Sequence, residues 1–385
     1  MQSNSDRNPA RRTTASESIV VAVAFVGIVG VGAGLRIPSL PFLGSLSRSP
    51  ATSSVLPAAS VPAGLSSPTI PTERAFATQQ PTLGGTASPT PKATTTVVVA
   101  AGDIACDINS PSFNGGVGRG NNCRAMATAG LIDGVQPDAV LALGDNQYED
   151  GGADQWLRSY ELSWGRFKSI THPVAGNHEY LACATYDLDC SYAPRAAGYS
   201  AYFGEAAGPT DQFWYSFDLA SWHVVALNSN CTNERVACGT GSAQDKWLRA
   251  DLAAHPVACT LAFFHHPRFS SGQHGDDATL DTLYRDLYDG GVDVLLAGHD
   301  HDYERFQPLD PSGRADAAHG IRNFVVGTGG RNLRRGTLAP RPITEAANDE
   351  TLGIIRLSLE PGVYSWTFIP IPGETFTDSG RSSCH

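Results

Sequence analysis

Five short apolar runs, each ending in a cluster that contains Asp, Asn or His, constrain the fold of this 385-residue chain most strongly. The runs are residues 94–101, 139–143, 170–175, 260–264 and 292–297. Their length and continuous apolar character predict strands that are buried on both faces. Helical patterns occur at residues 124–132, 153–164, 242–254 and 278–289. Strands that alternate with helices indicate an α/β fold with much parallel sheet.

Two further pairs of apolar runs are typical of β-hairpins. Residues 213–219 pair with 222–228 in the first, and residues 353–359 pair with 363–369 in the second. Connections of two or three residues join antiparallel neighbours. We therefore expect both hairpins to extend the sheet at its edges.

The polar residues that follow the five apolar runs are the main functional clue. They are Asp103, Asp145, Tyr148, Asn177, His178, His265, His299 and His301. Ligands of α/β sheets bind beyond the carboxyl ends of the strands. We therefore expect all five clusters to meet at one edge of the sheet.

This set of side chains offers oxygen and imidazole donors without thiolates, which suits iron, zinc or manganese. A single tetrahedral site needs only three or four protein ligands. Seven or eight donors, one of them a carboxylate that can bridge, suit two metal ions about 3.5–4 Å apart. Individually, each residue also has a structural interpretation as a helix cap, a turn residue or a surface side chain.

The clusters have the order Gly-Asp, Gly-Asp-x-x-Tyr, Gly-Asn-His-Glu, His-x-Pro and Gly-His-x-His. They occur at residues 102–105, 144–148, 176–179, 265–267 and 298–301. This series resembles the ligand pattern of calcineurin-like metallophosphoesterases, and Tyr148 resembles the purple acid phosphatase branch. The resemblance covers roughly residues 94–330. It implies an α/β fold in which a β-sandwich is flanked by helices (αββα), with the metal site at the carboxyl ends of the strands.

The resemblance also implies a role for each donor. Asp103, Tyr148 and His301 would hold one metal ion, Asn177, His265 and His299 would hold the other, and Asp145 would bridge them. Many relatives have a histidine ligand where this chain has Ala105. Tyr148 would replace that ligand, and its phenolate favours Fe³⁺ at the first position. Fe²⁺, Zn²⁺ or Mn²⁺ is expected at the second.

The expected activity is hydrolysis of phosphate monoesters, with a metal-bound hydroxide attacking phosphorus. His178 and His274 are the candidate catalytic residues, because an imidazole can protonate the leaving group near neutral pH. His274 has the alternative of being a solvated loop residue. A phosphodiesterase or nucleotidase on the same metal ions is the first alternative function. A metal-binding surface protein without activity is the second.

The N-terminal quarter of the chain predicts export rather than a folded domain. Residues 1–18 carry three arginines, and residues 19–35 are uncharged, apolar and glycine-rich. This layout predicts a signal peptide, with a retained membrane anchor as the alternative. Residues 36–93 are rich in Ser, Thr, Pro and Ala and predict a disordered linker. Residues 94–385 would form the catalytic domain, which is expected to be secreted or extracytoplasmic, with attachment to a membrane or wall through the N-terminal segment.

Cysteine content and charge agree with an exported enzyme of small substrates. The eight cysteines include three pairs that are close in sequence and leave Cys259 and Cys384. They predict disulfides, and reduced cysteines are the alternative. The sequence does not determine which cysteines pair. The net charge of −11 argues against nucleic-acid binding. The resemblance implies a small phosphorylated substrate as the partner. Residues 331–335 contain three arginines, interpreted as a solvated basic cluster or, alternatively, as charges that attract anionic substrates.

Overall fold

The computed structural model describes residues 95–181, 196–210, 212–231 and 236–385. The predicted signal peptide or anchor and the predicted linker lie outside these residues. Within the described ranges, no helix combines the length and the apolar character that crossing a membrane requires.

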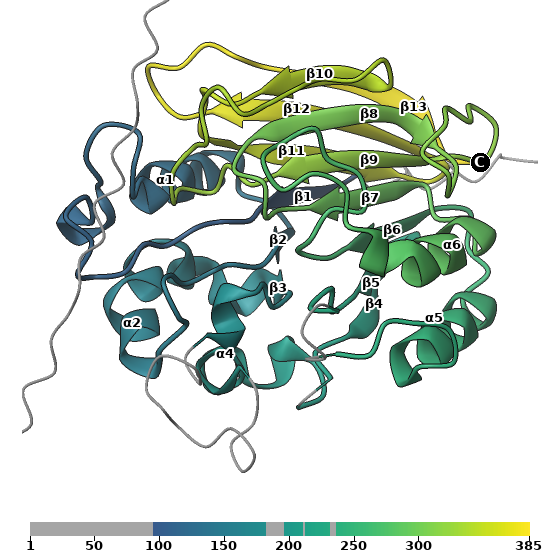
Figure 1. Cartoon of the computed structure of the whole chain (residues 1–385), viewed down its shortest axis with the longest axis horizontal. Helices are drawn as coiled ribbons and strands as arrows, with labels where there is room; N and C mark the ends of the chain where they lie inside the picture. The colour runs from purple at the N-terminus through teal and green to yellow at the C-terminus, as the bar shows by residue number, and fades with distance from the viewer. Residues whose placement is uncertain (1–94, 182–195, 211, 232–235) are drawn as a thin grey trace, which may run out of the picture. The chain divides into compact units, whose positions relative to one another are not determined.

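Two β-sheets form the centre of the fold (Figure 1). The first has the strand order β13 (Ser379–Ser383), β12 (Val363–Pro370), β11 (Gly353–Glu360), β1 (Thr96–Ala101), β2 (Ala139–Ala142) and β3 (Thr171–Pro173). The second has the order β10 (Thr344–Asn348), β8 (Tyr303–Leu309), β9 (Ile321–Val326), β7 (Val294–Ala297), β6 (Thr260–Phe263), β5 (Trp222–Ala226) and β4 (Tyr215–Leu219). In the first sheet, β1 pairs in parallel with β2, and β2 pairs in parallel with β3. In the second sheet, parallel pairing joins β5, β6, β7 and β9 in that order.

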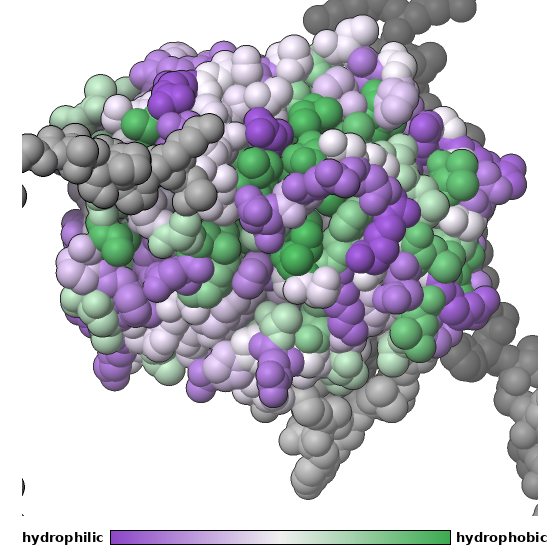
Figure 2. Space-filling model, turned by 180° about the vertical axis from the view of Figure 1, so that it is seen from behind, coloured by the Kyte–Doolittle hydropathy of each residue, from purple (hydrophilic) through white to green (hydrophobic). Residues whose placement is uncertain are grey.

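Helices flank the sheets on their outer sides. They are α1 (Ala125–Val135), α2 (Ala153–Arg158), α4 (Ala197–Phe203), α5 (Ala243–Ala254) and α6 (Asp281–Asp289). In Figure 1, α1, α2 and α4 lie on one side of the molecule, and α5 and α6 lie on the other. This arrangement confirms the predicted α/β sandwich. The described surface seen in Figure 2 mixes hydrophilic and hydrophobic residues.

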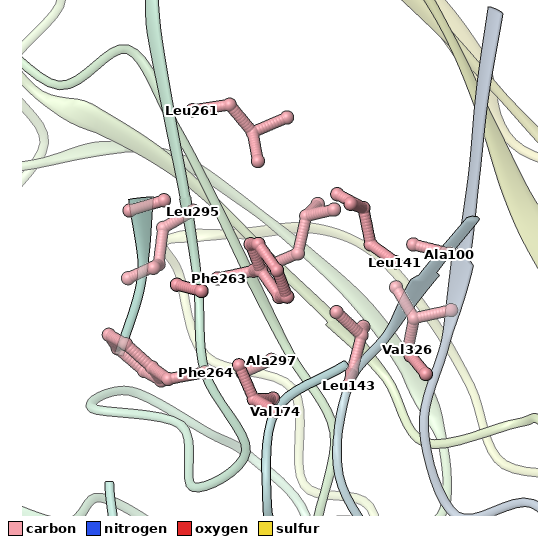
Figure 3. Close-up of a cluster of buried hydrophobic side chains, with 14 of the residues drawn as sticks. Ala100, Leu141, Leu143, Val174, Leu261, Phe263, Phe264, Leu295, Ala297 and Val326 are labelled. Atoms are coloured by element: carbon pink, nitrogen blue, oxygen red, sulfur yellow. The ribbon is translucent and has the colours of Figure 1, made fainter. Parts of the chain in front are cut away.

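The core lies between the two sheets, where apolar side chains from both pack together (Figure 3). The first sheet and the residues after its strands contribute Ala100, Leu141, Leu143 and Val174, and the second contributes Leu261, Phe263, Leu295, Ala297 and Val326. All of them are at most 3 % exposed, as expected for strands covered on both faces. This packing fixes the strand ends, and therefore the polar residues that follow them.

Three of the expectations about elements are wrong. The five strands do not share one sheet, because β1, β2 and β3 belong to the first and β6 and β7 to the second. The helix expected at 153–164 ends at Arg158, because the Ser159 hydroxyl donates to the Cys106 carbonyl and Tyr160 N–H donates to Gln147. The second hairpin is not at an edge, because β13 pairs beyond it.

Three disulfides cross-link the described residues. They join Cys106 to Cys123, Cys231 to Cys238, and Cys259 to Cys384. The last of these pairs could not be assigned from the sequence, and its partners are 125 residues apart. The remaining pair, residues 183 and 190, lies outside the described residues. The disulfide prediction is therefore confirmed for the cysteines that the structure describes.

Candidate metal centre

The predicted donors follow the carboxyl ends of strands from both sheets. Asp103 follows β1, Asp145 follows β2, and His299 follows β7. These three residues have positive φ angles of 61°, 46° and 71°. A residue with a side chain adopts this left-handed backbone at a cost, and such strain is concentrated at functional sites. The left-handed backbone at these positions turns the chain sharply after each of the three strands.

Glycines next to the donors allow the segments to approach one another. A β-carbon on Gly144 would lie 2.7 Å from the His265 ring. A β-carbon on Gly298 would lie 2.8 Å from Oδ2 of Asp103. Real side chains do not tolerate such distances, so both positions require glycine. The Gly-Asp and Gly-His pairs of the sequence are thus explained by close packing.

Three of the donors form a cluster, here named the tyrosine group: Asp103, Tyr148 and His301. The Tyr148 hydroxyl donates to Oδ1 of Asp103 at 2.7 Å and lies 3.1 Å from Nε2 of His301. Nε2 of His301 lies 3.2 Å from the same Asp103 oxygen. The three residues are at most 4 % exposed. They converge although the first and the last are 198 positions apart in the sequence.

Three other donors form a second cluster, here named the histidine group: Asn177, His265 and His299. Nε2 of His265 lies 3.2 Å from Oδ1 of Asn177 and 3.2 Å from Nδ1 of His299. Asp145 lies between the two groups. Its Oδ2 lies 3.0 Å from the Tyr148 hydroxyl oxygen, and its Oδ1 lies 3.3 Å from Nε2 of His265.

Main-chain carbonyls orient two of the imidazoles. Nδ1 of His265 lies 2.9 Å from the Leu143 carbonyl, and Nδ1 of His301 lies 2.9 Å from the Asn332 carbonyl. Each ring therefore presents Nε2 to the cluster, as metal-ligating histidines do when the other nitrogen donates to a fixed acceptor. The ligand atoms of Asp103, Asp145 and His265 all lie within 4.8 Å of one another.

Glu179 supports the loops that carry the donors. Its buried carboxylate accepts from the main-chain N–H groups of Asn146, Gln147 and Gly176, at 2.9, 3.1 and 2.6 Å. Burial, and then the Asp145 carboxylate, raise the pKa of Glu179 to about 8. Both of its carboxylate oxygens accept hydrogen bonds from the main chain. Glu179 therefore positions the loops that carry the metal ligands and is not itself placed as a ligand.

The charges in the cluster are strongly coupled. Burial acts to raise the pKa of Asp145, but the imidazoles of His265 and His178 outweigh burial and hold that pKa well below its usual range. Burial acts to lower the pKa of His265, but Asp145 outweighs it and raises the pKa to about 9. Burial and the two carboxylates raise the pKa of Tyr148 well above its usual range. Tyr148 therefore becomes an anionic donor only where a strong cation compensates its charge.

The two candidate catalytic histidines lie beside these groups. The main-chain N–H of His178 donates to Oδ1 of Asp145 at 2.9 Å, and its ring lies 4.3 Å from the Tyr148 ring. The His274 ring lies 4.2 Å from the His299 ring. A cavity of about 370 Å³ opens here. Its lining includes Asn177, His266, His274 and His299.

The structure thus brings all nine predicted site residues into one contiguous cluster. Ser229 was not among the predicted site residues, but its hydroxyl accepts from the main-chain N–H groups of His265 and His266 at 3.1 and 2.8 Å. Ser229 also lies 3.0 Å from Nδ1 of His266. The signal was present, because the apolar run 222–228 also ends in a polar cluster, but that run was interpreted only as part of a hairpin.

The arginines of residues 331–335 are only partly a solvated cluster. Arg335 is exposed, whereas Arg331 and Arg334 are half-buried. The guanidinium of Arg331 lies 5.0 Å from the centre of the Tyr148 ring and pairs with Glu149. The Arg334 guanidinium donates to Gln273 at 3.0 Å. Two of the three cations therefore lie beside the donor cluster.

A two-sheet α/β sandwich with Asp, Asn, Tyr and His donors gathered beyond its strand ends is the architecture of a metallophosphoesterase. The chain belongs to the calcineurin-like phosphoesterase family, whose family model matches residues 97–303. It is 29 % identical over 260 residues to purple acid phosphatase 18 of Arabidopsis thaliana, covering 63 % of this chain and 55 % of the relative. It is 28 % identical over 200 residues to human acid phosphatase type 7, covering 45 % and 41 %. The chain thus spans about half the length of the curated relatives it matches.

Solved structures show the same fold. Purple acid phosphatase PPD1 from yellow lupin (Lupinus luteus) seeds aligns with a TM-score of 0.58 at 20 % identity, covering 77 % of this chain and 55 % of that one. GAP50, the anchor in the inner membrane complex of Plasmodium, aligns with a TM-score of 0.51 at 12 % identity, covering 76 % and 90 %. At these identities the likeness establishes the fold alone.

Proposed function

We propose that this protein hydrolyses phosphate monoesters at a centre of two metal ions. The position of Asp145 carries the proposal, because one of its oxygens lies 3.0 Å from the Tyr148 hydroxyl and the other lies 3.3 Å from Nε2 of His265. A single carboxylate thus contacts both donor groups. A carboxylate in this position can bridge two cations about 3.5–4 Å apart.

The donor chemistry fits two different ions. The tyrosine group would hold Fe³⁺, because a phenolate is a hard, charged donor. The histidine group, with its imidazoles and amide oxygen, would hold Fe²⁺, Zn²⁺ or Mn²⁺. When bound, such ions withdraw charge from phosphoryl oxygens and lower the pKa of a bound water.

The chain's own side chains would bind the substrate and move protons. The cavity beside the histidine group has room for a phosphoryl group and its ester substituent. His178 and His274 are the proposed proton donors to the leaving oxygen, because they flank the two donor groups without belonging to either. A protonated alcohol leaves more readily than an alkoxide, so this step accelerates cleavage.

Phosphate release from an aryl phosphate by the metal-loaded protein tests this proposal. Asp145→Asn should lower kcat/KM by at least about a hundredfold and reduce the bound metal, because an amide lacks the bridging charge. Asp150→Asn is the matched control. Asp150 is also buried, but its carboxylate accepts from the main chain of Gly152 at 3.1 Å, outside the donor groups.

A bis-aryl phosphate separates the alternatives. Preferential turnover of this diester would replace the proposal with a phosphodiesterase or nucleotidase. A protein that binds two metal ions and hydrolyses neither ester would be a metal-binding protein without this activity. Preferential turnover of the monoester supports the proposal.

We further propose that residues 94–385 are the catalytic domain of an exported enzyme, with residues 1–35 as a signal peptide or anchor and residues 36–93 as a linker. The three disulfides of the described residues support an oxidising compartment. Mass spectrometry of the protein recovered from its native cells would locate the N-terminus. Recovery of a reduced, unprocessed chain from the cytosol would contradict export.

A further inference from the structure

Residues 331–335 are attached to the metal centre through their main chain. The N–H of Arg331 donates to the Asp103 carbonyl at 2.8 Å. The Asn332 carbonyl lies 2.9 Å from Nδ1 of His301, and the N–H of Arg334 donates to the His301 carbonyl at 3.3 Å. Three hydrogen bonds to residues of the tyrosine group therefore hold the backbone of residues 331–334 beside that group.

The side chain of Arg334 reaches from this segment to the loop that contains His274. Its guanidinium donates to Oε1 of Gln273 at 3.0 Å. Gln273 immediately precedes His274, which lines the cavity and packs against the His299 ring. The Arg334 guanidinium therefore spans from the tyrosine group to the loop that adjoins the histidine group.

The charge of Arg334 has no carboxylate partner among the residues that the structure describes. Two nearby arginines do have carboxylate partners: Arg331 pairs with Glu149, and Arg341 pairs with Asp276. Arg334 is half-buried, and its Nε lies buried without a hydrogen-bond partner in the described part of the chain. A partly desolvated guanidinium without a counter-ion is costly, and a bound anion would offset that cost.

A guanidinium has a planar fork of donors that matches the geometry of phosphate oxygens. A phosphate monoester carries about −1.5 to −2 charges at neutral pH, whereas a diester carries only one. Building on the proposed function, we propose that Arg334 is a substrate-binding residue that contacts the phosphoryl group and favours dianionic monoesters over diesters. The added charge of the monoester strengthens this contact.

Steady-state kinetics of the metal-loaded full chain test this role, with Arg334→Gln as the variant. The matched control is Arg335→Gln, because Arg335 is adjacent but exposed and donates to the Glu350 carbonyl at 3.1 Å. For p-nitrophenyl phosphate, Arg334→Gln should raise KM about tenfold and leave kcat within about twofold. For bis(p-nitrophenyl) phosphate, KM should change less than about twofold. Arg335→Gln should match the wild type on both.

Arg334→Lys keeps the positive charge but lacks the planar donors of a guanidinium. As the more conservative substitution, it keeps the test decisive if Arg334→Gln fails to fold. It should raise KM for the monoester about threefold. Equal KM values in Arg334→Gln and Arg335→Gln, or an equal loss on both esters, would overturn the role of Arg334. Calorimetric binding of inorganic phosphate gives a readout without turnover, and Arg334→Gln should weaken it about tenfold.

The binding measurement keeps the two proposals separable. If the wild type hydrolyses no ester, the proposed function fails, and phosphate binding still decides the role of Arg334. If the wild type is active but Arg334→Gln binds phosphate as the wild type does, only the inference about Arg334 fails.

Discussion

The Tyr148 hydroxyl donates a hydrogen bond of 2.7 Å to Oδ1 of Asp103, so the phenol of one strand-end loop meets the carboxylate of another. Position 105, two residues after Asp103, is an alanine that forms a bridge with Gln147, the residue before Tyr148. This pairing brings the phenol to the tyrosine group, where the methyl side chain of Ala105 offers no donor atom. The arrangement provides the hard anionic donor proposed for Fe³⁺.

Replacement of Tyr148 by Phe tests the iron assignment. An Fe³⁺-phenolate contact absorbs visible light, so the iron-loaded wild type should be coloured and Tyr148→Phe should lose the band. Activity should fall about tenfold or more, because one donor is removed. Absorption spectra and metal analysis provide the measurement.

Tyr160→Phe is the matched control for that experiment. Tyr160 is fully buried, and its hydroxyl has no hydrogen-bond partner among the described residues. Its removal should leave both colour and activity unchanged. A colourless wild type that is fully active with Zn²⁺ or Mn²⁺ would rule out Fe³⁺ while leaving the hydrolase proposal in place.

The strand-end donors could be predicted because their position depends on local pattern. Asp103, Asp145 and His265 each follow a buried apolar run, and parallel strands place such residues at a common edge. The division of the strands between two sheets was not predictable from the same pattern, because it depends on which strands pair. Both sheets nevertheless present their carboxyl ends to one site.

The features that the sequence did not reveal depend on long-range contacts or lack periodicity. β8 carries Glu304, Arg305 and Pro308 within its length, and β13 is almost entirely polar, so neither has the apolar pattern of a strand. The Arg334 side chain donates a hydrogen bond to Gln273, which is 61 residues away in the sequence. Periodicity in a single sequence contains no information about such contacts.

Gly144→Ala tests whether close packing against His265 holds the site together. Gly144 has φ of +85°, and an added β-carbon would lie 2.7 Å from the ring. The left-handed backbone alone costs an alanine roughly 1–2 kcal/mol, and the overlap adds about 1–3 kcal/mol. The variant should therefore lose stability and bind metal less tightly, as measured by denaturant unfolding and metal analysis.

Gly241→Ala separates the overlap from the backbone strain. Gly241 has φ of +86°, but an added β-carbon would meet nothing within 4 Å. This variant should lose only the roughly 1–2 kcal/mol of backbone strain and keep its metal content. Equal losses in the two variants would contradict the packing argument.

We expect the buried His223 to contribute to stability at low pH and to lose this contribution at high pH. Its two ring nitrogens each lie 2.9 Å from a carboxylate, of Asp218 and of Asp251, and its ring stacks 4.2 Å from that of His255. Burial acts to lower the pKa of His223, but the hydrogen bonds to Asp251 and Asp218 outweigh burial and raise it. Its contribution is fully present below its ordinary pKa of 6.5 and is lost as pH rises through the raised pKa. Thermal unfolding should therefore show His223→Gln to be more destabilising at pH 5.5 than at pH 9.

We expect the stability contribution of His172 to have the opposite pH dependence, which makes this residue the comparison for His223. Burial lowers the pKa of His172 to about 4, and its ring stacks 3.7 Å from that of Phe217. A lowered histidine pKa favours folding above the ordinary value, and this contribution is lost as pH falls from about 6.5 towards 4. His172→Gln should thus reduce the loss of stability between pH 6.5 and 4. The same pH dependence in both variants would exclude these assignments.

The disulfide between Cys259 and Cys384 should contribute more stability than that between Cys231 and Cys238. The first closes a separation of 125 residues and the second a separation of 7. In the chain-entropy description, these loops correspond to about 5 and about 2 kcal/mol, because the longer cross-link removes more freedom from the unfolded chain. The double Cys→Ser variant of each pair, unfolded in denaturant without reductant, measures the difference. Cys384 also anchors the end of β13, where the His385 N–H donates to Asp293 at 2.9 Å. A smaller loss from the 259–384 pair would mean that these contacts hold the C-terminal strand in place without the cross-link.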